Sequence, residues 1–208
     1  MKFVEHRVAD SRILRLIRKF LRAGVSEEGQ WTKTEVGTPQ GAVISPLLAN
    51  IYLHYVLDLW VHRWRSHHAR GEVYIVRFAD DFVMGFQYKS DAQRFEKELV
   101  QRLKSFGLEL HEEKTRLIEF GRFAAKSRKE RGEGKPETFD FLGFTHYCAR
   151  RRSDNGYTVR RKTIAKKMRA KLKEVRQDLK RNRHKPVGWQ GQWLKSVVRG
   201  HFNYYAVP

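Results

Sequence analysis

The feature that most constrains the fold of this chain is a pair of short apolar runs separated by two adjacent aspartates. The runs, residues 73–78 and 82–86, are rich in the β-branched and aromatic residues that favour strands. Asp80 and Asp81 lie between them. The pattern predicts a β-hairpin that buries its apolar side chains and holds the acidic pair at its tip. Two interpretations of the pair stay open: an ordinary turn, which aspartate tolerates, or a Mg²⁺ site, since Mg²⁺ prefers hard oxygen ligands.

The charge of the chain indicates a class of partner. Lys and Arg number 43 against 23 Asp and Glu, which gives a formal net charge of +20. An excess of that size predicts a polyanionic partner. We expect nucleic acid and no membrane, because no long apolar span exists and the basic segments contain aromatic residues that could stack on bases. The single cysteine, Cys148, excludes an internal disulfide. With no signal peptide recognised, we expect a cytoplasmic protein associated with nucleic acid.

A loop rich in glycine and proline precedes an apolar helix. Gly37, Pro39 and Gly41 predict a tight, irregular loop whose backbone can approach a ligand closely. Ser45 followed by Pro46 predicts the helix start, because serine caps helices and proline suits the first helical position. The helix should lie on the sheet as part of the core, and the loop is the functional candidate.

The segment after the hairpin reads as a helix followed by less regular structure. Ser90 and Gln93 predict a capping box, and Gly107 predicts the end of the helix. We expect a strand over residues 116–120 and a mobile surface loop over the polar, apolar-poor residues 122–137. Strand character resumes at 139–144, where Gly143 predicts a bend or a close backbone approach.

The composition changes towards the C-terminus, where a subdomain boundary is expected between residues 152 and 163. A very basic helix with one apolar stripe follows, and then a second helix rich in aromatic residues. The basic side chains are expected to contact RNA phosphates. Trp189, Trp193 and Tyr204 either stack on bases or fill the core, and their helical spacing favours the core.

Taken in order, these motifs resemble the reverse transcriptases encoded by bacterial group II introns, whose C-terminal part also serves as an RNA-splicing maturase. The acidic signature of that family, usually Tyr-Ala-Asp-Asp, corresponds to Phe78-Ala79-Asp80-Asp81, with Phe in place of Tyr. The other matching segments are 37–41 with 45–53, 107–110 with 114–115, 141–144, and 193–194 with 200–205. The resemblance spans nearly the whole chain, and several motifs in order are far more specific than one.

The resemblance implies an α+β fold. It consists of a partial polymerase palm over residues 1–152, an antiparallel sheet backed by helices, followed by a basic helical thumb or maturase-like subdomain over 153–208. It also implies site residues. Asp80 and Asp81 would be catalytic and would hold Mg²⁺ in a two-metal site. The nucleotide- and template-binding residues would be Pro39, Gln40, Gly41, Phe78, Ala79 and Lys114. Leu142 and Gly143 would form the primer grip. The RNA-binding residues would be Arg150, Arg151, Arg152, Arg160, Arg161, Lys166, Lys167 and Lys173.

The implied activity is that of an RNA-directed DNA polymerase, which joins dNTPs to a DNA primer along an RNA template. The palm of the family begins with another metal-binding aspartate, on a strand that precedes the first helix, and the fingers motifs lie before it. Met1 falls inside or just before that helix, and Asp10 is no substitute because it caps a helix. We therefore expect one protein ligand of the metal site to be missing here and to come from a complementing N-terminal fragment or from a dimer. The alternative is a non-catalytic RNA-binding maturase fragment that assists intron RNA folding and splicing.

Overall fold

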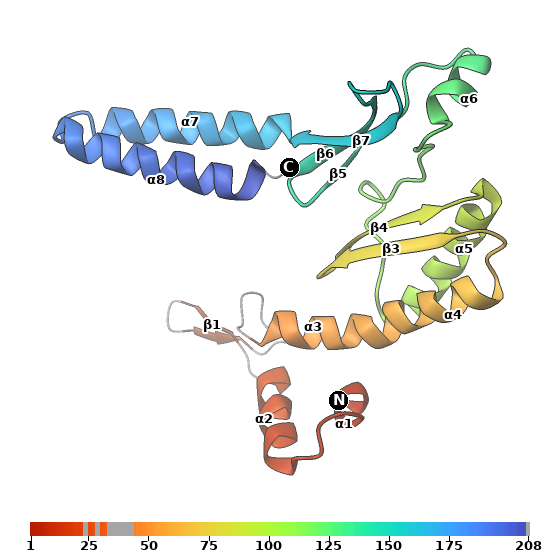
Figure 1. Cartoon of the computed structure of the whole chain (residues 1–208). Coiled ribbons are helices and arrows are strands. Elements are labelled where there is room, and N and C mark those ends of the chain that lie inside the picture. Colours follow the sequence, from red (N-terminus) through yellow and green to blue (C-terminus); the bar gives the residue numbers. More distant parts are fainter. Residues whose placement is uncertain (23–24, 28–29, 33–43, 207–208) are drawn as a thin grey trace. The chain divides into compact units, whose positions relative to one another are not determined.

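The computed structural model describes residues 1–22, 25–27, 30–32 and 44–206, with side chains for 1–22 and 44–206. Helices are combined with small antiparallel sheets, which confirms the predicted α+β class (Figure 1). The chain divides into two compact units, Met1–Leu117 and Ile118–Pro208. The division into a palm and a thumb at residue 152 stays a prediction.

The first unit combines helices with two hairpins. Helices α3, η1 and α4 follow one another without a break, and η1 is a turn of π-helix between two α-helices. The elements in chain order are α1 (Lys2–Glu5), α2 (Ser11–Arg22), β1 (Val25–Glu27), β2 (Gln30–Thr32), α3 (Ser45–Leu53), η1 (His54–Asp58), α4 (Leu59–His67), β3 (Val73–Phe78), β4 (Asp81–Phe86) and α5 (Lys89–Lys104).

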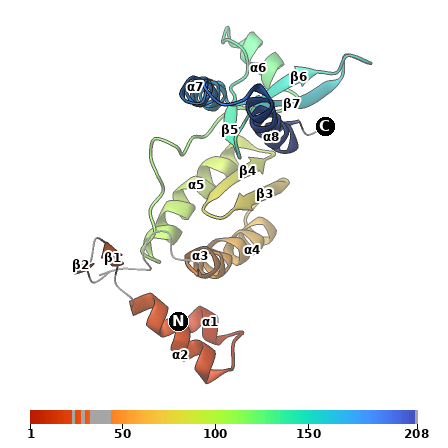
Figure 2. The ribbon, with the colours of Figure 1, turned by 90° about the vertical axis from the view of Figure 1, so that its left-hand side faces the viewer.

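The predicted hairpin is present, and one of its faces is buried on helices (Figures 1 and 2). Strands β3 and β4 pair antiparallel from Val73 opposite Phe86 to Phe78 opposite Asp81. Because side chains alternate along a strand, the hairpin has an inner and an outer face. Phe78 is 62% exposed on the outer face, together with Tyr74 and Val76. The buried cluster under the inner face consists of Val56, Leu57, Val61, Trp64, Val73, Phe95, Leu99 and Leu103.

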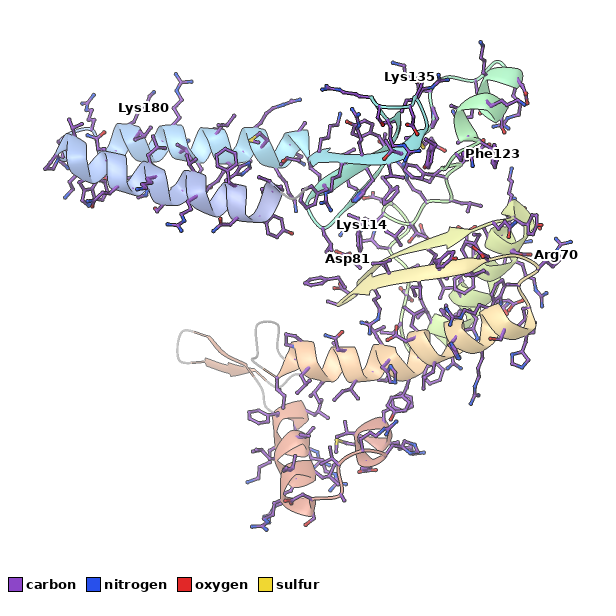
Figure 3. The ribbon with its side chains drawn as sticks, viewed as in Figure 1. Arg70, Asp81, Lys114, Phe123, Lys135 and Lys180 are labelled. Carbon is purple, nitrogen blue, oxygen red and sulfur yellow. The ribbon has the colours of Figure 1, made fainter. Side chains whose placement is uncertain are left out.

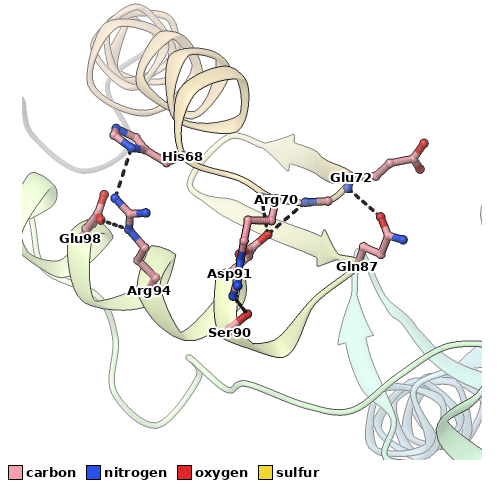
Figure 4. Close-up of polar contacts among 9 residues, drawn as sticks. His68, Arg70, Glu72, Gln87, Ser90, Asp91, Arg94 and Glu98 are labelled. Atoms are coloured by element: carbon pink, nitrogen blue, oxygen red, sulfur yellow. Dashed lines mark hydrogen bonds and ion pairs between the residues drawn. The ribbon is translucent and has the colours of Figure 1, made fainter.

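The predicted capping box at the start of α5 is wrong. The helix begins at Lys89, and the residue before it, Tyr88, makes no side-chain cap. Ser90 therefore lies inside the first turn, where its hydroxyl accepts a hydrogen bond of 2.5 Å from the guanidinium of Arg70 (Figure 4). The sequence pattern was right about where the helix starts and wrong about which side chains hold it.

The carboxylate of Asp91 anchors α5 to the loop before β3. It is buried and accepts hydrogen bonds from the backbone N–H groups of Arg70, at 2.8 Å, and Gly71, at 3.2 Å (Figure 4). Burial by itself would raise the pKa of Asp91, but these donors and the Arg70 guanidinium lower it below its ordinary value. Two turns further on, Glu98 accepts hydrogen bonds from Arg94 and from the indole of Trp64. Polar contacts thus tie α5 to α4 and to the hairpin.

The end of α5 follows the prediction, and the segment beyond it does not. The helix ends at Lys104, and Gly107 adopts a φ of 67°, a left-handed conformation that suits glycine. The strand predicted over residues 116–120 is absent, because residues 115–120 have no regular structure. Leu108 and Leu110 instead pack their side chains against the core. Apolar contacts, without strand pairing, hold this part of the chain.

The second unit contains a three-stranded antiparallel sheet and a helical hairpin. The sheet has the order β5-β6-β7, and both neighbouring pairs are antiparallel. Helices α7 and α8 run antiparallel (Figure 1). The elements are α6 (Ala124–Glu130), β5 (Phe139–Phe141), β6 (Phe144–Arg150), β7 (Tyr157–Thr163), α7 (Ala165–Arg181) and α8 (Val187–Tyr205).

The surface loop predicted over residues 122–137 contains a helix, α6. Two arginines pair with glutamates that surround this helix. Arg131 pairs with Glu119 and Glu133, and Arg128 pairs with Glu133 and Glu137. The segment is poor in apolar residues, as the sequence indicated. Ion pairs between these arginines and glutamates help to hold the helix in place. The prediction of an unstructured loop was therefore wrong for residues 124–130.

The turn between β5 and β6 is tight and has an unusual backbone. Leu142 and Gly143 have φ values of 48° and 85° between the paired residues Phe141 and Phe144. Positive φ at both central residues is typical of a two-residue hairpin turn whose twist matches that of the strands. A Cβ atom at Gly143 would lie 3.2 Å from the hydroxyl oxygen of Tyr205. The sequence prediction of a bend with close backbone approach at Gly143 is confirmed.

We predict that Phe95→Ala lowers the free energy of unfolding of the first unit by about 3–5 kcal/mol, because it removes a fully packed ring and leaves a cavity. Phe95 is only 2% exposed. Chemical denaturation followed by tryptophan fluorescence measures the change. The matched control is Val100→Ala on the same helix, where the side chain is 49% exposed. The control should change stability by less than about 0.5 kcal/mol. Equal effects of the two substitutions would contradict the packing described.

We predict opposite effects for the same substitution at two glycines of the second unit. Gly143→Ala should destabilise by about 1–2 kcal/mol, because an L side chain is strained at positive φ. Gly191, inside α8, has nothing within 4 Å of an added Cβ. Gly191→Ala should therefore stabilise by about 0.5–1 kcal/mol, because alanine has the higher helix propensity. Thermal unfolding of both variants tests the pair, and a shift of the same sign in both would refute it.

Candidate active site and nucleic-acid interface

The two aspartates stand at the outer end of the β3–β4 hairpin. Asp80 lies in the turn, after Ala79, whose φ is 53°, and Asp81 is the first residue of β4. Both are exposed. In the described part of the chain, no hydrogen bond or ion pair engages either carboxylate. Two neighbouring acids on a rigid element, unpaired by the described side chains, are available to a cation.

The donor chemistry of this pair fits Mg²⁺ in part. Carboxylate oxygens are the hard ligands that Mg²⁺ prefers, and the ion usually combines one or two carboxylates with waters and substrate phosphates. Among the residues with described side chains, no group of three or more His, Cys, Asp or Glu is arranged to hold a metal. Asp80 and Asp81 could therefore supply part of a coordination shell, with the remaining ligands coming from elsewhere.

An arginine beneath the turn was missed at the sequence level. Arg77 precedes Phe78 on β3 and points to the inner face, where its guanidinium contacts Asp58 at 2.7 Å. Nη1 also donates to the backbone oxygen of Ala79 at 2.7 Å and to Oδ1 of Asn50 at 2.8 Å. One signal could have revealed it: a charged residue at an inward position of an alternating strand needs a buried partner.

The predicted nucleotide-binding residues are only partly placed. Pro39, Gln40 and Gly41 lie outside the described residues. Phe78 is the last residue of β3, and Ala79 is part of the acidic turn. Lys114 is exposed in a turn after α5, and its backbone N–H bonds to the oxygen of His111 at 3.1 Å (Figure 3). In the part of the chain that the structure describes, no contact joins Lys114 to either aspartate. Its role in nucleotide binding stays a prediction.

The residues predicted as a primer grip form the β5–β6 turn. The hydroxyl of Tyr204, from the end of α8, donates to the backbone oxygen of Leu142 at 2.9 Å. The ring of Tyr204 also stacks on Phe144, with centroids 6.0 Å apart. The backbone N–H of Ile164, just before α7, bonds to the oxygen of Gly143 at 3.1 Å. This turn is therefore held by one residue just before α7 and by one at the end of α8.

The arginines predicted to bind RNA in the sheet do not share one face. Arg160 is opposite Tyr147 in the β6–β7 ladder, whereas Arg161 is opposite His146 and lies over the ring of Phe144 at 5.6 Å. Alternation of side chains puts these two arginines on opposite faces. The remaining three, at the end of β6 and in the following turn, are exposed: Arg150, Arg151 and Arg152. Arg151 forms an exposed ion pair with Asp154 at 2.8 Å.

Helix α7 carries a longer basic stripe than the sequence analysis identified. Lys166, Lys167 and Lys173 are exposed, as predicted. Helical spacing puts three further exposed basic residues on the face of Lys166 and Lys173, namely Arg169, Arg176 and Lys180 (Figure 3 labels Lys180). The spacing was available in the sequence and could have revealed them. Five cations along one face match a regularly charged polyanion better than isolated lysines do.

The aromatic residues of α8 are less buried than their helical spacing suggested. Trp193 is half-buried, whereas Trp189 is 43% exposed and Tyr204 is 53% exposed. The prediction that these residues fill a core is wrong for Trp189 and Tyr204 in this unit. An exposed aromatic beside basic residues is compatible with stacking on a nucleic-acid base.

Among the helices in the described ranges, none combines the length and the apolar character that crossing a bilayer requires.

Comparison with known proteins gives a family for the chain. Residues 2–146 match the family model of reverse transcriptase (RNA-dependent DNA polymerase). The match includes α1, the acidic hairpin, α5 and the β5–β6 turn, so the proposed active-site and primer-grip segments both fall within it.

Individual relatives are similar over shorter segments. Group II intron-encoded protein LtrA of Lactococcus lactis subsp. cremoris is 53% identical over 57 residues, 26% of this chain and 10% of that protein. An uncharacterized 91 kDa protein in a cob intron of Schizosaccharomyces pombe is 47% identical over 60 residues, 29% of this chain and 7% of that protein. A putative COX1/OXI3 intron 1 protein of Saccharomyces cerevisiae is 28% identical over 163 residues, 55% of this chain and 19% of that protein. The chain thus matches less than a fifth of the length of each relative. On the extent of the family match, the chain belongs to the reverse transcriptase (RNA-dependent DNA polymerase) family, and within it the chain is similar to proteins encoded by group II introns.

Proposed function

We propose that this chain forms part of a group II intron-type RNA-directed DNA polymerase, in which Asp80 and Asp81 are catalytic and hold Mg²⁺. The observation that carries the proposal is the β3–β4 turn, which presents two exposed carboxylates that no described side chain pairs. Bound there, Mg²⁺ would activate the 3′-hydroxyl of the primer and neutralise the leaving pyrophosphate of a dNTP. A further carboxylate ligand would come from a complementing reverse transcriptase fragment or from a second copy of the chain.

The other residues would position the substrates. Phe78, on the outer face of the hairpin, offers a flat apolar surface beside the acids. Lys114 would compensate phosphate charge, and the loop with Pro39, Gln40 and Gly41 would line the nucleotide pocket. Leu142 and Gly143 would grip the primer, because contacts with Tyr204 and Ile164 hold the backbone of their turn in place. The basic stripe of α7 would contact the template or intron RNA.

A second function has an observation in its favour. Two carboxylates are fewer than a complete catalytic metal site requires, whereas α7 presents a complete basic stripe. The alternative is therefore a non-catalytic maturase module that binds intron RNA and assists its folding and splicing. In that case the acidic hairpin would be a structural remnant, and RNA binding would not depend on Asp80.

For the polymerase, we predict that the purified chain extends a DNA primer on an RNA template with dNTPs and Mg²⁺ once an N-terminal reverse transcriptase fragment supplies the further carboxylate. Asp80→Asn should reduce extension on the order of 10³-fold, since a metal ligand contributes several kcal/mol to the transition state. The control is Asp10→Asn, which makes the same charge change at an exposed acid. Asp10 bonds to the backbone N–H of Arg12 at 2.7 Å, and asparagine retains that capping ability. Extension by Asp80→Asn at the wild-type rate, or no extension by the wild-type chain together with that fragment, would refute the polymerase function.

For RNA binding, we predict that affinity falls steeply as salt rises. Lys173→Gln should reduce the slope of log K against log salt concentration by about 0.7–0.9, the contribution of one phosphate contact. The control is Lys171→Gln, because Lys171 is paired with Glu174 at 2.8 Å and lies on another side of α7. Fluorescence anisotropy over a salt series measures both. An unchanged slope for Lys173→Gln would exclude the stripe. Binding that survives Asp80→Asn, in a chain without extension activity, would support the maturase alternative.

A further inference from the structure

The inner face of the hairpin carries one charged residue among apolar ones. Arg77 follows Val73 and Ile75 on that face, and its side chain is only 14% exposed. Removing a charge from water is unfavourable unless the charge is paired and hydrogen-bonded. Arg77 meets that requirement through four hydrogen bonds, and the identity of the acceptors indicates what the arginine does.

The four bonds join the acidic turn to the helix beneath it. Nε and Nη2 donate to the two carboxylate oxygens of Asp58, both at 2.7 Å, and this bidentate geometry is the strongest available to an arginine. Nη1 donates to Oδ1 of Asn50 at 2.8 Å and to the backbone oxygen of Ala79 at 2.7 Å. Because the guanidinium is planar and rigid, its three acceptors are fixed relative to one another.

The bond to Ala79 acts directly on the peptide that carries Asp80. Ala79 has a φ of 53°, which is unfavourable for an L residue, so the turn needs an interaction that holds it. The carbonyl of Ala79 belongs to the peptide group that ends at the nitrogen of Asp80. Fixing that oxygen fixes the plane of the peptide and hence the direction in which Asp80 leaves the turn.

The π-helical turn η1 brings the two helix acceptors together. Asn50 lies in α3, and Asp58 is the last residue of η1. In a regular α-helix, residues separated as these are would be offset by about 80° around the axis. A π-turn puts more residues in a turn and reduces that offset, so both side chains can reach the same guanidinium. Irregular turns of this kind are frequent at functional sites.

Asp58 also determines which carboxylate the guanidinium of Arg77 contacts. Its hydrogen bonds hold the pKa of Arg77 above its ordinary value, although burial opposes this. The guanidinium is charged in any case, as arginine is throughout proteins. With that charge neutralised by Asp58, Arg77 leaves Asp80 and Asp81 free for another cation. If Asp58 were neutral, the nearest carboxylates on the hairpin would be those of the acidic turn, and Arg77 would compete with a metal ion for them.

We propose that Arg77, held by Asp58 and Asn50, is a positioning residue that fixes the Ala79–Asp80 peptide and keeps the guanidinium away from the two acids. The metal-binding part rests on the function proposed above. The ordering of the turn does not, because it concerns the hairpin of the free protein. The test therefore reads the two parts separately.

The first measurement is ¹⁵N relaxation of the full chain, which reports the order of the Asp80 and Asp81 amides. In the wild type both should have order parameters of about 0.85, as in rigid backbone, and in Arg77→Lys they should fall below about 0.6. Lysine keeps the charge but cannot bond to Asp58 and Ala79 together. The matched control is Arg94→Lys, which disturbs the Arg94–Glu98 pair of α5 and should leave the turn ordered. If the amides of α5 lose order as much as the turn does, Arg77 has only a general structural role and the proposal fails.

The second measurement is the affinity for Mn²⁺, followed by water-proton relaxation. Asp58→Asn should weaken the affinity about 10-fold or more, because Arg77 then turns to the acids, and Arg94→Lys should not change it. Asn50→Ala, at an exposed position, is the milder variant if Asp58→Asn does not fold, and it should lower the order of the turn. If Asp80→Asn leaves the wild-type affinity unchanged, the metal site is refuted. The relaxation result then decides by itself whether Arg77 orders the turn. Unchanged order in Arg77→Lys, or unchanged affinity in a folded Asp58→Asn, would overturn the proposal.

Discussion

The structure of the first unit depends on the burial of one face of a two-stranded hairpin. An isolated hairpin is barely stable in water, and it needs a further layer against which to bury apolar side chains. Here that layer is η1, α4 and α5, whose cluster includes the fully packed Trp64 and Phe95. Because the side chains of a strand alternate, burying one face decides the direction of every residue on the hairpin. The outward position of Asp81 and the inward position of Arg77 follow from the same packing.

Polar contacts complete what the apolar cluster begins. Asp91 anchors the first turn of α5 to the loop before β3, and Arg77 ties the far end of the hairpin to η1. The two anchors stand at opposite ends of the hairpin, so its position on the helices is set at both ends. Each uses a charged group that is largely removed from water, where hydrogen bonds are directional and costly to lose. The hairpin that carries the acidic turn is therefore fixed on the helices by polar contacts at both of its ends.

The second unit is organised differently. It buries little in its helices, and its order comes from strand pairing, ion pairs and the contacts of the β5–β6 turn with Tyr204 and Tyr205. A unit of this kind presents large basic and aromatic surfaces, which suits an extended charged partner. The exposed aromatic residues of α8 and the basic stripe of α7 belong to one helical hairpin, which accords with the proposed contact to RNA.

The sequence by itself determined the class of the protein, the acidic hairpin, the bend at Gly143 and the two long C-terminal helices. These follow from local signals: alternation, helical spacing and turn residues such as Gly143. Only the tertiary structure decided how Arg77, Asp58 and Asn50 meet, that Asp91 and not Ser90 anchors α5, and that ion pairs around Arg131 order a helix in a polar segment. Such contacts join residues far apart in the chain or depend on the exact turn of a helix. No periodic pattern encodes them, because the partner of a buried charge is chosen by the packing of whole elements and not by its neighbours in sequence.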